Sequence, residues 1–169
     1  MDIDLQNGKE IATLAGGCFW CTEAVFLELN GVEKVISGYT GGLIKNPSYR
    51  EICTGTTGHA EAIQIIYDSK LIAYEDLLEI FFSTHNPTTL NRQGADIGTQ
   101  YRSEIFYHSE EQKQAAEKYI DLLEKEKLFN SPIVTKVSAA VVFYVAEESH
   151  QNYYNQNESQ GYCQMVIAP

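Results

Sequence analysis

Apolar residues fall along the chain in short runs and alternations that are typical of β-strands. Six segments carry this pattern: 10–16, 32–39, 60–67, 101–107, 133–137 and 141–144. The first of these segments ends in two glycines, and the last two are short. Within the segment 60–67, the strand period of two places Glu61 on the face that also carries Ile63, Ile65 and Tyr67. The pattern therefore predicts one carboxylate among apolar neighbours.

Three other segments follow the period of an α-helix. Residues 18–30 predict a helix that is stopped by Asn30-Gly31, with Gly31 at the C′ position. A second, amphipathic helix is predicted by apolar residues at i, i+3, i+4 and i+7, which are Tyr74, Leu77, Leu78 and Phe81. Ser109 and Gln112 resemble a capping box. The helix that they open is expected to bury Ala116, Tyr119, Ile120 and Leu123.

The order of these elements, β-α-β, β-α, β-α-β, predicts an α+β fold. We expect a two-layer α/β sandwich with a ferredoxin-like (split βαβ) core, long inserted loops and an irregular C-terminal tail. The segment 86–100 has no regular pattern, and a patternless loop of that length is usually functional or mobile. No repeat or linker divides the chain. Residues 1–169 are therefore expected to form a single catalytic domain, with an N-terminal extension (1–9) and a C-terminal tail (149–169) that carries Cys163.

Composition and net charge exclude some classes of binding partner. The 169 residues include 44% hydrophobic and 21% charged residues, as in an ordinary globular domain. The net charge of −11 argues against nucleic acid or an anionic membrane as a partner. No basic-then-apolar leader is visible, and no apolar run approaches the roughly 18–20 residues that span a bilayer. We therefore expect a cytoplasmic protein. The pattern marks no self-complementary apolar stripe; a monomer is expected, although the oligomeric state stays open.

The most informative motif is Cys18-Phe19-Trp20-Cys21, which follows Gly16-Gly17 at the predicted junction of strand and helix. Free backbone N–H groups and the helix dipole at such a junction favour thiolate over thiol. The thiolate is the reactive form of cysteine. The alternative for Cys18 is a small buried hydrophobe, which is a common place for a free cysteine. The two glycines, the helix start and the second cysteine all favour a reactive thiol.

Cys18 and Cys21 form a Cys-x-x-Cys motif, which can mark a thioredoxin-like redox centre. A zinc site is disfavoured, because no second cysteine pair or Cys/His pair completes four ligands. Surface or hydrogen-bonded structural roles are expected for the four scattered histidines, which are His59, His85, His108 and His150. The sequence therefore predicts no metal and no cofactor.

Polar side chains that could protonate or hydrogen-bond a substrate oxygen lie further along the chain. If Glu61 is interior, desolvation should raise its pKa, and a neutral carboxylic acid can act as a general acid. The alternative, a glutamate at a strand end that faces solvent, stays equally open from the pattern. Tyr49 and Tyr101 could donate hydrogen bonds to an oxygen, and Asp96 could order a water. Taken singly, each of these three residues is more often structural than catalytic.

Several short segments together resemble one known family, peptide methionine sulfoxide reductase A. The resemblance is carried, in one order along the chain, by GCFW (17–20), GYTGG (38–42), NPSYRE (46–51), GHAE (58–61), GTQYRS (98–103), HQNY (150–153) and GYC (161–163). It runs over nearly the whole sequence. It implies reduction of the S epimer of methionine sulfoxide, free or within proteins. Cys18 would attack the sulfur and become a sulfenic acid, while Glu61 would protonate the oxygen.

The resemblance also implies roles for the neighbouring residues. Tyr49 and Tyr101 would hydrogen-bond the sulfoxide oxygen, and Asp96 would support the same site. Phe19 and Trp20 would form the pocket for the S-methyl group of the substrate. No residue of this set is expected to bind a metal.

The resemblance further implies that a second thiol condenses with the sulfenic acid, and that an external dithiol such as thioredoxin then reduces the disulfide. The motif departs from the commonest family pattern, because Cys21 stands where glycine is frequent. Cys163 matches the usual resolving position and is preferred. Cys21 is the alternative, since Cα atoms at i and i+3 of a helix lie within disulfide reach. Cys53 is expected to be an inert packed thiol.

Two other functions remain as alternatives. A general dithiol oxidoreductase that uses only Cys18 and Cys21 would leave Glu61 and the tyrosines without a role. A binding module that holds an apolar or oxidised peptide through Phe19 and Trp20 would leave the thiol unexplained.

Overall fold

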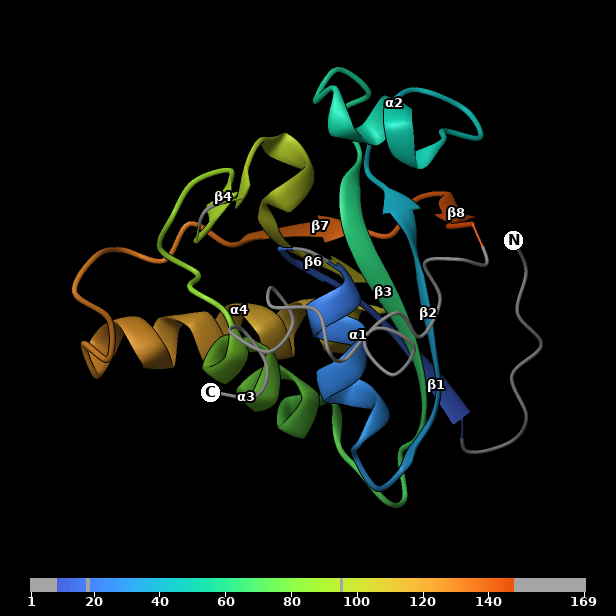
Figure 1. The fold of residues 1–169 in the computed structure, drawn as a ribbon. Helices are drawn as coiled ribbons and strands as arrows, with labels where there is room; N and C mark the ends of the chain where they lie inside the picture. Colours follow the sequence, from blue (N-terminus) through green and yellow to red (C-terminus); the bar gives the residue numbers. More distant parts are fainter. Residues whose placement is uncertain (1–8, 18, 95, 148–169) are drawn as a thin grey trace.

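The computed structural model describes residues 9–17, 19–94 and 96–147, except for the side chains of Trp20 and Cys21. The chain forms two layers, in which helices pack on one face of a twisted sheet (Figure 1). The strands are β1 (Lys9–Gly16), β2 (Val32–Thr40), β3 (Ala60–Asp68), β4 (Arg92–Gln93), β5 (Asp96–Ile97), β6 (Ser103–Tyr107), β7 (Lys136–Ala139) and β8 (Phe143–Val145). The helices are α1 (Phe19–Leu27), α2 (Tyr49–Cys53), α3 (Tyr74–Thr84) and α4 (Glu110–Lys125), with a 3₁₀ turn η1 (Thr99–Tyr101).

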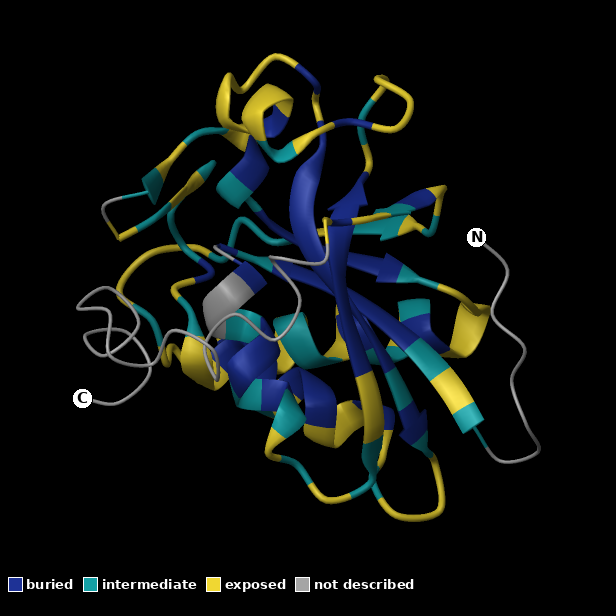
Figure 2. Cartoon of the chain, turned by 45° about the vertical axis from the view of Figure 1, so that its right-hand side comes forward, coloured by how far each residue is buried: buried dark blue, intermediate teal, exposed yellow. Residues whose placement is uncertain are grey.

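The main sheet has six strands in the order β7-β6-β1-β3-β2-β8. Its pairs are antiparallel except for β6 and β7, which run parallel. β3 lies inside the sheet between β1 and β2, and both of its faces are buried along most of its length, as the dark strand at the centre of Figure 2 shows. This explains why the β3 sequence is apolar on both faces. Of the two positions that the pattern leaves open for Glu61, the structure shows the interior one.

The helix-covered face holds the larger hydrophobic core. Apolar residues of α1, α3 and α4 meet alternate residues of the strands in one cluster, which includes Phe26, Leu78, Ala116, Leu14 and Ile63. A smaller cluster on the opposite face contains Ala15, Ile36, Ala60, Ala62, Phe106 and Phe143. The predicted α+β fold with two layers is confirmed at this level. Among the described residues, none of the helices is both long and apolar enough to traverse a bilayer.

Several predicted element boundaries are wrong, and the last two strands are Lys136–Ala139 and Phe143–Val145 rather than 133–137 and 141–144. The first helix ends at Leu27 rather than at residue 30, so Gly31 is not its C′ residue. Gly31 does adopt a positive φ of 98°, but it does so in the turn that enters β2, where a Cβ would also collide with Ile72. The strand predicted from residue 101 begins at Ser103, because Tyr101 belongs to the preceding 3₁₀ turn.

Two local elements were missed by the hydrophobic pattern. The short helix α2 is opened by Ser48, whose side chain accepts the backbone N–H of Glu51, while the Glu51 carboxylate accepts the N–H of Ser48. Ser-x-x-Glu is the signature of a capping box, so this signal was present in the sequence. The segment 86–100 contains the two-residue strands β4 and β5, which pair with each other. Such short strands carry no hydrophobic periodicity.

Candidate active site

The site is centred on Glu61, the second residue of β3, whose side chain is 1% exposed. One of its carboxylate oxygens, Oε1, accepts the backbone N–H of Phe19 at 3.2 Å. Phe19 is the first residue of α1, and an N–H at that position has no partner within the helix. The carboxyl group therefore satisfies an amide at the positive end of the helix, directly beside the predicted thiol position 18.

Tyr39 lies next to Glu61 across the sheet. The two residues are register partners of β2 and β3, which places their side chains on the same, helix-covered face. The ring of Phe19 packs against Tyr39 and Tyr49 with centroid separations of 5.6 and 6.4 Å. Phe19 is fully buried, so this ring forms an apolar wall beside the carboxyl group.

The Tyr49 phenol belongs to the same group of side chains. Burial raises its pKa far above the ordinary range, and the charge of Glu61 adds to this effect. A hydrogen bond with the thiol of Cys53 and the proximity of Tyr101 raise the same pKa further. Tyr49, Glu61 and Tyr101 were predicted as site residues from separate motifs, and the fold brings them into mutual electrostatic contact.

Cys53 corrects one prediction. It was expected to be an inert packed thiol, but it is exposed at the end of α2. The reason is local: α2 is a five-residue helix on a surface loop, and only Ile52 of its residues is buried. The Cys53 side chain reaches the Tyr49 hydroxyl instead of the core.

Asp96 and Tyr101 lie on the loop between α3 and β6. Asp96 is half-buried in β5, opposite Gln93 of β4. Tyr101 is half-buried in η1, where its backbone N–H bonds the carbonyl of Gly98. The segment predicted to be a functional loop thus holds short, hydrogen-bonded elements that position both residues.

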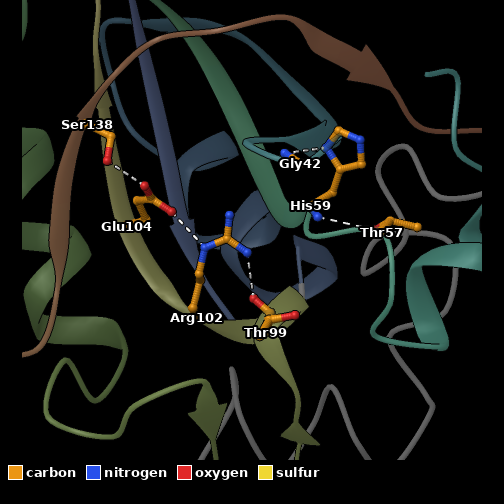
Figure 3. Close-up of polar contacts among 7 residues, drawn as sticks. All are labelled: Gly42, Thr57, His59, Thr99, Arg102, Glu104 and Ser138. Atoms are coloured by element: carbon orange, nitrogen blue, oxygen red, sulfur yellow. Dashed lines mark hydrogen bonds and ion pairs between the residues drawn. The ribbon is translucent and has the colours of Figure 1, made fainter. Parts of the chain in front are cut away.

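A polar network anchors this loop to the sheet from the face opposite Glu61. The Arg102 Nε donates to Glu104 at 2.7 Å, and its Nη1 donates to the carbonyl of Thr99 at 2.9 Å (Figure 3). The second oxygen of Glu104 accepts the Ser138 hydroxyl at 2.6 Å. Arg102 therefore ties η1, and with it Tyr101, to strands β6 and β7.

His59 anchors the other loop. Its Nδ1 accepts the N–H of Gly42 at 3.0 Å (Figure 3). Its Nε2 lies 2.6 Å from the carbonyl oxygen of Ile44. A backbone N–H can only donate and a carbonyl can only accept, so this geometry assigns a proton to Nε2 and none to Nδ1. The predicted structural, hydrogen-bonded role is confirmed for His59. It holds the loop that follows β2 close to the start of β3 and thus to Glu61.

The glycine turn before residue 18 is packed from two sides. A Cβ on Gly16 would lie 2.7 Å from the Phe81 ring and 3.2 Å from His85. A Cβ on Gly17, whose φ is 98°, would lie 2.8 Å from Gln93. The His85 ring bonds the Phe81 carbonyl through Nδ1 and the Ser103 hydroxyl through Nε2. These two glycines let the chain pass between fixed side chains on its way to position 18.

Several predictions fall outside the described residues. These are the roles of Cys18 and Cys163, of the Trp20 and Cys21 side chains, and of His150. Within the part of the chain that the structure describes, no cluster of three metal-ligating side chains is found.

Sequence reasoning missed Tyr39, Arg102 and the anchoring role of His59. Tyr39 could be found only through the register of β2 against β3, which pairs it with Glu61. Arg102 directly follows the predicted residue Tyr101, and His59 lies two positions before Glu61, but nothing in their local pattern indicates a partner. Together the described groups form a buried carboxyl, three phenols and an apolar ring at a helix N-terminus. This arrangement can donate protons or hydrogen bonds to an oxygen on a substrate that also carries an apolar group.

Comparison with known proteins gives matches over nearly the whole chain. A family model described as peptide methionine sulfoxide reductase matches residues 10–169. The chain is 56% identical over 168 residues to peptide methionine sulfoxide reductase MsrA 1 of Rhodopirellula baltica, covering 99% of this chain and 86% of that protein.

Solved structures give the same result. The fold is similar to that of Mxr1 from Saccharomyces cerevisiae in reduced form, with a TM-score of 0.87 at 35% identity over 94% of this chain and 91% of that chain. Mxr1 in complex with Trx2 is also similar, with a TM-score of 0.63 at 25% identity over 89% of each chain.

Proposed function

The chain belongs to the peptide methionine sulfoxide reductase family, and on this basis we propose that it reduces the S epimer of methionine sulfoxide, free and in proteins. Cys18 is the nucleophile and Glu61 is the general acid. The observation that carries this assignment is the hydrogen bond from the Phe19 N–H to Glu61. Cys18 is covalently bonded to Phe19, and consecutive Cα atoms are only about 3.8 Å apart. A thiol and a buried acid thus belong to the same site.

The chemistry needs both groups. The Cys18 thiolate attacks the sulfoxide sulfur and forms an S–S bond to it, while Glu61 gives a proton to the oxygen. The resulting hydroxyl then passes to the Cys18 sulfur: the bond from oxygen to the substrate sulfur and the new S–S bond break, methionine leaves, and Cys18 becomes a sulfenic acid. Burial of Glu61 supports its acid role, because desolvation disfavours the charged form.

Tyr49 and Tyr101 hold the sulfoxide oxygen by hydrogen bonds, and Asp96 supports their loop. Phe19 and Trp20 receive the S-methyl group. The described packing of the Phe19 ring between Tyr39 and Tyr49 supports an apolar wall at this position.

Turnover is completed by a second thiol. Cys163 attacks the sulfenic acid, a disulfide forms and water leaves; Cys21 is the alternative resolving residue. Thioredoxin then reduces the disulfide by thiol exchange. The complex of yeast Mxr1 with Trx2 supports this choice of reductant. A reducing cytoplasm is the compartment that fits such a cycle.

The organisation of the chain is also proposed. The elements β1-α1-β2-β3-α3-β6 have the β-α-β-β-α-β order of a ferredoxin-like split βαβ core, extended by β7 and β8 at the two edges. Residues 1–169 act as one catalytic domain with the tail 149–169 supplying Cys163. No nucleic acid or membrane is needed as a partner, and the protein works as a monomer.

One assay tests the reaction. Thioredoxin-coupled turnover is measured on the separate S and R epimers with the wild type, Cys18→Ser and Glu61→Gln. We expect turnover of the S epimer only, loss of all activity in Cys18→Ser, and a decrease of about 10²- to 10⁴-fold in Glu61→Gln, because that variant lacks the acid. Full activity of Glu61→Gln would exclude Glu61 as the acid.

Mass spectrometry of the protein after one turnover without reductant identifies the resolving thiol. A disulfide between Cys18 and Cys163 is expected. A Cys18–Cys21 disulfide in its place would contradict the preference for Cys163 without affecting the first step.

A further inference from the structure

Tyr39 carries a buried hydroxyl group that the proposed reaction does not yet use. Its side chain is 0% exposed, and within the described part of the chain its oxygen has no hydrogen-bond partner. An unsatisfied buried polar group costs about 1–3 kcal/mol, and native proteins retain few of them. A buried donor that lacks a protein partner is what a bound substrate can satisfy.

The ordinary behaviour of a buried tyrosine is seen elsewhere on the same face. Tyr67 is also 0% exposed, and its hydroxyl donates to Glu10 at 2.9 Å. A tyrosine buried in this core can therefore have a hydrogen-bond partner for its hydroxyl. Burial alone does not explain why the Tyr39 hydroxyl has no partner among the described residues.

The position of Tyr39 supplies that reason. Its register partner across the sheet is Glu61, and its ring packs against Phe19, the first residue of α1. The charges of Glu147, Glu61 and Cys53 all act on its hydroxyl. The phenol thus lies among the residues that surround the proposed sulfoxide position.

We propose that Tyr39 is a catalytic residue whose hydroxyl donates a hydrogen bond to the sulfoxide oxygen, as a third phenol beside Tyr49 and Tyr101. This inference rests on the proposed function. The proton stays on Tyr39 throughout, and Glu61 remains the group that transfers one. Burial above all, followed by the nearby charges, raises the pKa of Tyr39, so the phenol stays protonated and can donate at neutral pH. The hydrogen bond strengthens as the S–O bond breaks and charge develops on the oxygen.

The chain offers a matched control in Tyr74, the first residue of α3. Its hydroxyl is also buried without a described hydrogen-bond partner, but Tyr74 lies at the start of α3, in the core under the helices. The variants Tyr39→Phe and Tyr74→Phe each remove one oxygen and keep the ring. Neither variant loses a described hydrogen bond, so the unfolding midpoint in urea should be unchanged or higher in both.

The experiment measures kcat and KM for the S epimer, together with the urea midpoint, in the wild type and both variants. We expect Tyr39→Phe to lower kcat by about tenfold or more, as loss of an oxygen-stabilising donor does, and Tyr74→Phe to leave it unchanged. Full kcat in Tyr39→Phe, an equal loss in both variants, or a loss accompanied by a lower midpoint would overturn the role of Tyr39.

Failure of this inference is distinguishable from failure of the proposed function. If the wild type reduces the S epimer and Glu61→Gln does not, while Tyr39→Phe is fully active, only the role of Tyr39 is wrong. If the wild type has no activity on the S epimer, the proposed function itself is wrong.

Discussion

Two glutamates are buried on opposite faces of the same sheet, and their surroundings differ. Glu104, 4% exposed on β6, is held by the Arg102 guanidinium at 2.7 Å and the Ser138 hydroxyl at 2.6 Å. Glu61, 1% exposed on β3, accepts a backbone N–H at 3.2 Å and faces the phenols of Tyr39 and Tyr49. The first carboxylate is paired with a guanidinium, whereas the N–H that the second accepts belongs to a neutral backbone amide.

The two surroundings suit different roles. The ion pair of Glu104 with Arg102, together with the bonds to Thr99 and Ser138, fixes the segments that it joins, which are η1, β6 and β7. A buried carboxyl beside an apolar ring and phenols can instead take up and release a proton at a moderate cost. Burial alone therefore does not distinguish the proposed acid, Glu61, from Glu104; the ion pair of Glu104 with Arg102 does.

The largest expected effect is on stability, from Glu104→Gln. This change leaves the Arg102 guanidinium, whose side chain is only 16% exposed, without its counter-charge. Breaking a buried pair on one side costs about 3–5 kcal/mol. Urea unfolding should show a loss of this size.

The double variant Arg102→Met with Glu104→Gln provides the control. With both charges gone, it should be less destabilised than the sum of the two single variants. A Glu104→Gln variant as stable as the wild type would show that the pair does not hold the loop, and the contrast between the two glutamates would fail.

Much of the fold follows from local sequence signals. β1, β2, β3, α3 and α4 were predicted because period and capping act over a few residues, as Ser109 and Gln112 do at the start of α4. α1 was predicted too long, because Asn30-Gly31 is the stop signal in the sequence while the chain already turns toward β2 after Leu27. Tertiary contacts, which the pattern does not contain, set that boundary.

The candidate site was predictable only in part, because local sequence signals do not contain the contacts between distant segments. Strand alternation raises an interior position for Glu61 but leaves a solvent-facing one equally open, and the roles of Tyr49 and Tyr101 come from the family resemblance. Tyr39 and Arg102 depend on which strands pair and in which register, and that information lies in contacts between distant segments. Cys53 was misplaced because exposure of α2 depends on where the loop lies on the surface.

A second, smaller effect is the pH dependence of stability that comes from His85, a buried ionisable residue on the same face of the sheet as Glu61. Burial lowers the pKa of His85 to about 4, against the opposing hydrogen bond to Phe81. In the unfolded chain His85 becomes protonated below about pH 6.5. In the folded chain it becomes protonated only near pH 4. Stability from this group is present above pH 6.5 and decreases by roughly 3 kcal/mol as the pH falls to 4.

The variant His85→Gln should flatten this dependence. Free energies of unfolding measured in urea between pH 7 and pH 4 should fall less steeply for the variant than for the wild type, while His108 remains in both as an internal reference. Parallel curves would mean that His85 is solvated, and that this side of the sheet does not keep ionisable groups neutral.

The smallest stability effect is expected from the same substitution at the other glutamate. In Glu61→Gln the amide oxygen can still accept the Phe19 N–H. The free energy of unfolding should change by less than about 1 kcal/mol, because a neutral side chain of the same shape keeps this hydrogen bond. Unfolding in urea at pH 7, side by side with Glu104→Gln, measures both changes under one condition. A loss at Glu61 as large as that at Glu104 would mean that Glu61 is a structural charge, and the acid would have to be sought among the remaining groups of the site.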